Sequence, residues 1–169
     1  MAPLIRTVHL SIDIQSPPDK VFAAVIDLPK YNAWLPKSTS FQGTTEFSET
    51  PPREGTKYEE HSSQGIRYGE IQKLDEAERH VIFHQPMKMK PLFLGVELDI
   101  TVDMIATPAD GNGCVLRREI HIQMPALLGL GAGLIVKQFE GESLRTMKFL
   151  KAYLEKEETV QVDKKTDTE

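Results

Sequence analysis

Two runs of alternating apolar and polar residues, joined by a glycine-rich turn, form the strongest pattern in the sequence. The first run, 94–104, has an apolar side chain at every even position, and the second, 114–124, has one at every even position except Arg118. A period of two is typical of a strand with one buried face. Asp110-Gly111-Asn112-Gly113 between them is typical of a hairpin turn. The chain is therefore predicted to contain an antiparallel sheet with one apolar face.

Further strand and helix signals precede this hairpin. Residues 8–14 alternate in the same way, and Ser16-Pro17-Pro18-Asp19 then has the cap, prolines and acid typical of a helix start. Two short helices are expected there, the second from Pro29 to Trp34. Segments with strand character then follow at 41–47, 56–62, 66–74 and 80–85.

After Pro125 the apolar spacing lengthens to mostly three or four residues, which predicts one long helix over 134–154. A sheet with one apolar face must be covered, and this helix is the only large cover that the pattern provides. The expected fold class is therefore α+β, with antiparallel strands curled around a C-terminal helix. Residues 1–157 are expected to form one domain, and the polar residues 158–169 a disordered tail.

Composition and charge narrow the classes of protein. The 169 residues suffice for one domain and contain no run of about 18 apolar residues that would predict a membrane helix. Of the formal charge of −5, residues 155–169 contribute −3, so the body is nearly neutral and has no basic stripe for nucleic acid. The first six residues lack the features of a secretory signal, and the lone Cys114 fits a reducing compartment. We expect a cytoplasmic protein without a nucleic-acid partner or stable membrane insertion.

Three local motifs, together with the order of elements, resemble a known superfamily. Ser16-Pro17-Pro18-Asp19-Lys20-Val21-Phe22 is similar to its first helix start, the Tyr-x-x-Trp of Asp27–Pro36 to its second helix, and Gly55-Thr56-Lys57-Tyr58 to one of its strand starts. Over roughly residues 6–154 the chain resembles the START-like, or SRPBCC, superfamily, which includes Bet v 1-like proteins and polyketide cyclases. The resemblance implies a helix-grip fold, with about six to seven curved antiparallel strands around a long helix and a deep cavity between them. Members of the superfamily transport lipids, bind hormones, cyclise polyketides or assist chaperones.

Arg118 interrupts the apolar pattern of the second hairpin strand. An unpaired buried charge costs several kcal/mol, so a guanidinium on this face needs a partner. Three explanations remain open. Arg118 forms a structural ion pair with a carboxylate such as Glu60, reaches solvent at the rim of the sheet, or anchors a ligand carboxylate, phenolate or enolate.

Glu60 and His84 are the other polar candidates for the cavity. If Tyr58 faces inward, Glu60 on the same strand does so too, and His84 faces inward if it follows Ile82. Together with Arg118 they would suit acid–base catalysis, with His84 or Glu60 as the base and Arg118 stabilising an oxyanion. The same three residues would equally suit a pocket that orients a ligand through a few polar contacts.

The predicted ligand contacts are mainly aromatic and apolar residues of the expected cavity wall. Tyr31 and Trp34 either hold the second short helix against the sheet or line the cavity, and Tyr68 could face either side of its strand. The full set of predicted contacts is Tyr31, Trp34, Tyr58, Tyr68, Leu98, Ile120, Leu134 and Gln138.

No cofactor or metal ion is predicted. Gly129-Leu130-Gly131-Ala132-Gly133 does not fit a dinucleotide motif, because position 134 is a leucine. His80 and His84 lie on a predicted strand, where four residues span about 13 Å, too far for adjacent ligands of one zinc ion.

The leading functional prediction is the binding of a small hydrophobic or aromatic molecule between the sheet and the long helix. One alternative is a cofactor-independent polyketide cyclase, dehydratase or isomerase of secondary metabolism. Another is a chaperone-activator or quinone-binding module. The enzyme requires a polar cluster in the cavity, the carrier only an apolar lining, and the protein-docking module an exposed apolar patch.

Overall fold

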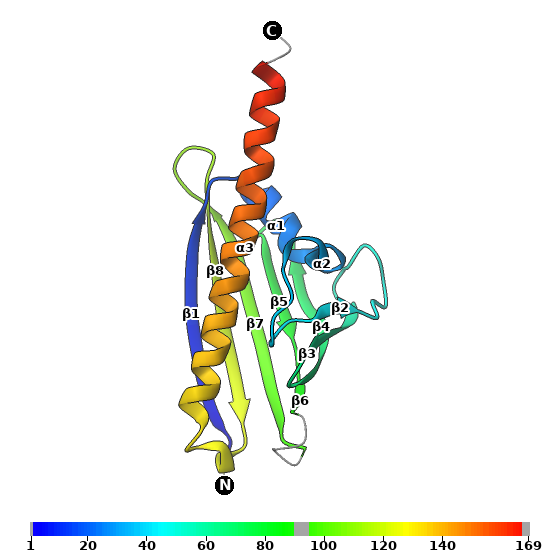
Figure 1. Ribbon diagram of the computed structural model, residues 1–169, viewed down its shortest axis with the longest axis vertical. Coiled ribbons are helices and arrows are strands. Elements are labelled where there is room, and N and C mark those ends of the chain that lie inside the picture. Colours follow the sequence, from blue (N-terminus) through cyan, green and yellow to red (C-terminus); the bar gives the residue numbers. More distant parts are fainter. Residues whose placement is uncertain (1, 90–94, 167–169) are drawn as a thin grey trace.

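The computed structural model describes residues 2–89 and 95–166. An antiparallel sheet curves around one long helix, and short helices close one end (Figure 1). In chain order the elements are β1 (Leu4–Ile14), α1 (Pro18–Ile26), the 3-10 helix η1 (Leu28–Lys30), α2 (Tyr31–Trp34), β2 (Gly43–Thr45), β3 (Lys57–Ser62), β4 (Gly65–Asp75), β5 (His80–His84), β6 (Met87–Met89), β7 (Glu97–Pro108), β8 (Cys114–Met124), the 3-10 helix η3 (Ala126–Leu128) and α3 (Ala132–Thr166). The helix-grip fold implied by the resemblance is confirmed.

The strand order places the first strand of the chain, β1, beside the last, β8. The strands lie in the order β1-β8-β7-β5-β4-β3-β2, and β6 pairs with both β4 and β7. Successive strands form a meander, while β1 returns to pair with β8 along its whole length. The hairpin β7–β8 pairs Val102 with Ile120 and Met104 with Arg118, so the even positions share the concave face.

Some elements differ from the predicted ones. The predicted strand 41–47 is reduced to Gly43–Thr45, and the short strand β6 has no counterpart in the sequence pattern. The predicted strand start at Leu94 lies outside the described residues. The long helix begins two residues before 134 and runs to Thr166, where the sequence predicted a tail from 158.

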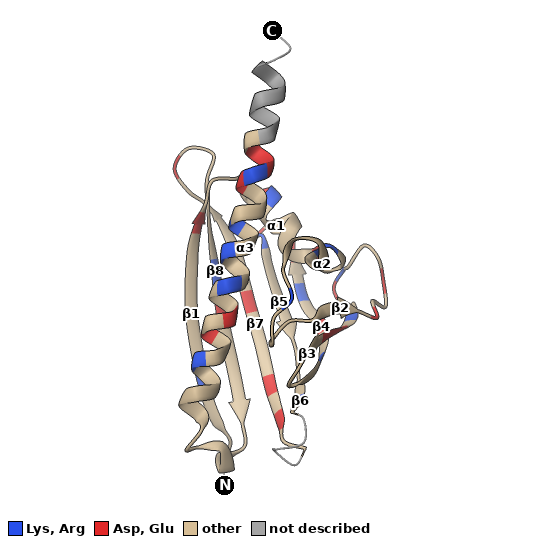
Figure 2. Ribbon diagram, viewed as in Figure 1, with Lys and Arg blue, Asp and Glu red and all other residues tan. Residues whose placement is uncertain are grey.

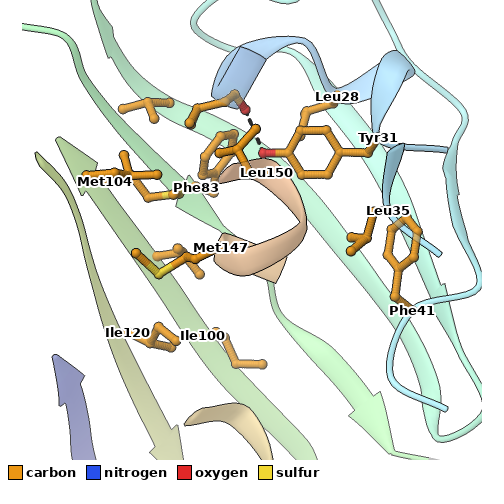
Figure 3. Close-up of a cluster of buried hydrophobic side chains, with 14 of the residues drawn as sticks. Leu28, Tyr31, Leu35, Phe41, Phe83, Ile100, Met104, Ile120, Met147 and Leu150 are labelled. Atoms are coloured by element: carbon orange, nitrogen blue, oxygen red, sulfur yellow. Dashed lines mark hydrogen bonds between the residues drawn. The ribbon is translucent and has the colours of Figure 1, made fainter. Parts of the chain in front are cut away.

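The core lies where α3 packs along the concave face of the sheet. Met147, Leu150 and Leu154 recur at three and four residues on one face of α3 and are buried. Figure 3 shows Met147 and Leu150 among side chains of the sheet, including Ile100 and Ile120. The face of α3 that points away carries charges of both signs along the helix (Figure 2). This is the pattern of a surface helix with one buried stripe.

The end of α3 extends past the sheet and contacts the start of α1 (Figure 1). Lys20 Nζ donates to Glu158 Oε1 at 2.8 Å, and the backbone N–H of Gln15 donates to Glu155 at 2.9 Å. None of the helices in the described ranges is long and apolar enough to cross a membrane.

Shortening a buried side chain of α3 tests the core. Met147 is 1% exposed, so Met147→Ala should lower the free energy of unfolding by about 2–5 kcal/mol. Leu134→Ala, at a position 75% exposed on the same helix, should change it by less than about 0.5 kcal/mol. Both values follow from denaturant titration, and equal losses would show that α3 does not pack in this way.

The Lys20–Glu158 contact should make a small, pH-dependent contribution to stability. The hydrogen bond from Lys20 holds the pKa of the Glu158 carboxyl below its ordinary value of 4.5. The contribution is therefore present above pH 4.5 and disappears as the pH falls through the lowered pKa. At pH 7, Glu158→Gln should cost up to about 1 kcal/mol, as for a partly exposed ion pair.

Measuring this cost by denaturation at both pH 7 and pH 3 checks the assignment. The loss of stability caused by Glu158→Gln should be smaller at pH 3. Glu140 is exposed on the same helix, so the control Glu140→Gln should change the free energy of unfolding little at either pH. A cost for Glu158→Gln that is the same at both pH values would contradict the contact.

Candidate functional site

A cavity lies between the concave face of the sheet, α2 and the first half of α3. Its volume is about 70 Å³, several times the roughly 10–15 Å³ that one water molecule requires on this measure. Gln138 is the exposed residue of the wall, so it marks the opening beside α3. The cavity therefore has room for a few non-hydrogen atoms and is reachable from solvent, and a larger ligand requires wall side chains to move, since a cavity that holds benzene measures about 150 Å³.

The cavity exists because the residues of α3 that face the sheet change in size along the helix. Met147, Leu150 and Leu154 are large, and they are buried against the sheet. Before them, Ser143 and Thr146 face the sheet, and these short side chains line the cavity. Space that large apolar residues fill from Met147 onward thus stays open beside Ser143 and Thr146.

Most of the wall is apolar and comes from the sheet. The concave positions of β7 and β8 contribute Leu98, Ile100, Val102, Met104 and Ile120. Unbranched methionines can change shape around a bound molecule at low cost. Leu98 and Ile120, two of the predicted ligand contacts, therefore lie in the cavity wall.

Glu60 and Arg67 form an ion pair at one side of the cavity. The residues face each other across the β3–β4 hairpin, and Arg67 Nη2 lies 2.5 Å from Glu60 Oε1. Arg67, which is 7% exposed, also donates to the carbonyl oxygen of Ser40 at 2.6 Å. The carboxylate of Glu60 is thus already engaged by an arginine of the neighbouring strand.

Two buried tyrosines add neutral polar groups to the wall. The hydroxyl of Tyr31 donates to the carbonyl oxygen of Val25 at 2.7 Å, which ties α2 to the end of α1 (Figure 3). Gln85 Nε2 donates to the Tyr58 hydroxyl at 2.6 Å. Burial raises the pKa of both phenols, so they are protonated at neutral pH.

Gly69 makes room for the ring of Tyr58. The two residues are cross-strand partners, and a Cβ atom built on Gly69 would lie 2.1 Å from Tyr58 Cζ. Any side chain at this position would push the ring off the sheet and away from Gln85. The absence of a side chain at position 69 therefore sets the position of the Tyr58 hydroxyl.

Arg118 also lies in the wall, and its partner is not Glu60. Its Nη1 lies 3.8 Å from the sulfur of Met104, and its buried Nε has no hydrogen-bond partner among the described residues. Burial lowers the pKa of the guanidinium, an effect that Tyr31 and Glu60 partly oppose. Of the explanations for Arg118, the structural ion pair with Glu60 is wrong, because Glu60 pairs with Arg67 and no N–O contact within 4 Å joins Arg118 to Glu60.

Four predicted site residues do not line the cavity. His84 points to the outer face and pairs with Asp99 at 2.5 Å, because Val81 and Phe83 occupy the inward positions of β5. Tyr68 is 48% exposed, since its neighbours Arg67 and Gly69 face inward.

The other two differences concern helices. Leu134 is exposed, because the first turn of α3 turns Ala132 and Ile135 toward the protein instead. Trp34 is buried between Tyr31 and Tyr153, with ring centroids 4.7 and 6.2 Å away. It therefore holds α2 against α3, the structural role that the sequence left open.

Arg67 and Gln85 are wall residues that sequence reasoning missed. Sequence reasoning did not point to Arg67, because its place opposite Glu60 depends on the two-residue turn Ser63-Gln64, which pairs Ser62 with Gly65. Gln85 shares the parity of Val81 and Phe83 in the predicted strand 80–85, so it became an inward residue once the inward face of that strand was known. Of the other candidates, Glu60, Arg118, Tyr31, Tyr58 and Gln138 lie in the wall.

The wall favours binding over acid–base chemistry. Its carboxylates in the described part of the chain are Glu60, held by Arg67, and Glu142, which lies 2.8 Å from Arg145. Neither a histidine nor a cysteine is among the described wall residues. No group of three or more potential metal ligands occurs in the same residues.

Replacing Gly69 tests how the Tyr58 hydroxyl is positioned. Gly69→Ala should lower the free energy of unfolding by about 1–3 kcal/mol, the usual cost of overpacking. Gly141→Ala provides a control of opposite sign, because a Cβ at Gly141 meets no atom within 4 Å and α3 there is helical. It should raise stability by about 0.5–1 kcal/mol. Denaturant titration measures both changes, and a neutral Gly69→Ala would show that the Tyr58 ring does not rest on this residue.

Comparisons with known proteins agree with this geometry. Residues 6–155 match the family model described as polyketide cyclase / dehydrase and lipid transport. A comparison with curated protein sequences finds no match.

Several solved structures share the fold at low sequence identity. Norcoclaurine synthase from Thalictrum flavum, in complex with dopamine and hydroxybenzaldehyde, is 15% identical with a TM-score of 0.70, over 92% of this chain and 89% of that one. The Zhui aromatase/cyclase from a Streptomyces species is 17% identical with a TM-score of 0.69, over 90% and 94%. Ginseng major latex-like protein 151 from Panax ginseng is 16% identical with a TM-score of 0.64, over 89% and 98%. The chain thus belongs to the polyketide cyclase/dehydrase and lipid transport family of the START-like superfamily.

Proposed function

We propose that the protein binds a small hydrophobic or aromatic molecule in the cavity beneath the first half of α3. The observation that carries the proposal is a reachable cavity whose wall is mainly apolar, with a few polar groups at defined places. Such a wall stabilises an apolar ligand by removing its surface from water, while polar groups fix its orientation.

The wall supports binding better than catalysis. Of the two candidate bases for a cyclase, dehydratase or isomerase, His84 faces the opposite side of the sheet and Glu60 is held in an ion pair with Arg67. Structural neighbours include an aromatase/cyclase and a synthase in complex with dopamine and hydroxybenzaldehyde. These names support a small, often aromatic ligand, whereas the reaction depends on wall residues that a shared fold does not determine.

Filling the cavity tests the proposal. The protein should bind a neutral environment-sensitive dye such as Nile red at about one equivalent, and small aromatic molecules should displace it. Val102 faces the cavity, so Val102→Phe should weaken dye binding at least about tenfold, because the added ring occupies the site, a change of about 1.4 kcal/mol.

A matched variant on the same strand separates cavity filling from a general effect. Thr101 is the neighbouring residue on the outer face, so Thr101→Phe should leave dye affinity unchanged. Fluorescence titration provides both affinities. Dye binding that does not saturate, or that survives in Val102→Phe, would exclude the cavity as the binding site.

A further inference from the structure

Arg118 occupies a position whose neighbours are apolar. Its neighbours on the concave face of β8 are Leu116 and Ile120, each 1% exposed. Its cross-strand partners are Leu10 on β1 and Met104 on β7. Packing against these residues would be satisfied by leucine or methionine. The charge of Arg118 therefore needs an explanation other than packing.

Each of the other charged groups of the described wall has an ion-pair partner. Glu60 is held by Arg67 at 2.5 Å, and Glu142 by Arg145 at 2.8 Å. Arg118 has only the weak acceptor sulfur of Met104, at 3.8 Å. Arg118 is therefore the one charged group of the described wall without an ion-pair partner.

The tyrosines of the wall do not supply the missing anion. Burial keeps both phenols in the neutral form, as their raised pKa values indicate. The Tyr31 hydroxyl is committed to the carbonyl oxygen of Val25, and that of Tyr58 accepts a hydrogen bond from Gln85. Neither tyrosine therefore neutralises the charge of Arg118.

A guanidinium in this setting favours a specific ligand chemistry. It presents five N–H donors in a planar fork that matches the two oxygens of a carboxylate. In a cavity with little water such a charge-assisted pair is stronger than a neutral hydrogen bond. The rest of the wall is suited to an apolar body of the same ligand.

We infer that the ligand is a hydrophobic monocarboxylic acid whose carboxylate is held by Arg118, with its apolar body along β7 and β8. This inference rests on the proposed function, since it specifies the ligand class of the same cavity. It distinguishes the protein from a carrier of neutral hydrophobic molecules, for which Arg118 would be a hindrance.

The test compares acids with their neutral amides. A panel of aromatic acids and matched amides, with 2-naphthoic acid and 2-naphthamide as the first pair, is titrated at pH 7 by displacement of Nile red. The protein should bind acids about 10- to 100-fold more tightly than the amides, the factor expected for one charge-assisted hydrogen bond. Arg118→Met should abolish this preference and leave amide affinity within about threefold, while Arg118→Lys should keep part of it.

Arg117→Met is the matched control, because Arg117 is the adjacent arginine on the exposed outer face of β8. It should keep the full preference for acids. If no acid in the panel binds more tightly than its amide, or if Arg118→Met keeps the preference, the inference is overturned while the proposed function stands. If the unsubstituted protein binds neither the dye nor any acid or amide of the panel, the proposed function is overturned instead.

Stability without ligand provides an independent readout. If Arg118 serves a ligand rather than the fold, Arg118→Met should leave Tm unchanged or raise it, because the substitution removes an unpaired charge and keeps most of the volume. A fall in Tm of more than about 4 °C, roughly 1 kcal/mol or more in a chain of this size, would assign Arg118 a structural role and overturn the inference.

Discussion

The packing of α3 against the concave face of the sheet determines both the core and the cavity. Met147, Leu150 and Leu154 are buried against the strands and carry much of the core. Close to them, Tyr31, Trp34 and Tyr153 connect α2 to α3. Earlier in α3, the short side chains of Ser143 and Thr146 leave space against the sheet, and the cavity is the result.

Most charged groups of the cavity wall are paired, which lowers the free-energy cost of burying them. Glu60 and Arg67 neutralise each other across a hairpin, and the carboxylate of Glu142 has Arg145 one turn away. The tyrosines are neutral and hydrogen-bonded. Arg118 alone among the described wall residues retains a charge without a carboxylate partner, and for this reason it is the most informative residue for the ligand.

The fold and the function of such a chain depend on different residues. At 15–17% identity, norcoclaurine synthase and the aromatase/cyclase keep the helix and the curved sheet over nine tenths of this chain. The pattern of apolar faces is sufficient to maintain such an architecture. Function depends on a few wall positions, such as 60, 67 and 118, and these have to be considered in each chain separately.

The sequence alone determined the main elements and the face of each long strand. Period-two alternation in β7 and β8 is long enough to assign Arg118 to the buried face, and the change of period after Pro125 identifies α3. Short elements carry too few residues for a period. The inward face of β5 was therefore misjudged, and His84 was expected in the cavity although it lies on the outer face.

Only the tertiary structure decided which groups meet. Arg67 sits opposite Glu60 at 2.5 Å, because the turn Ser63-Gln64 sets the register of β3 against β4, and Arg118 on a distant strand has no carboxylate partner among the described residues. The rotation of α3 that exposes Leu134 likewise depends on how the helix rests on the strands. A periodic pattern specifies the face of an element relative to its own axis, whereas contacts between distant elements depend on how those axes are placed in space.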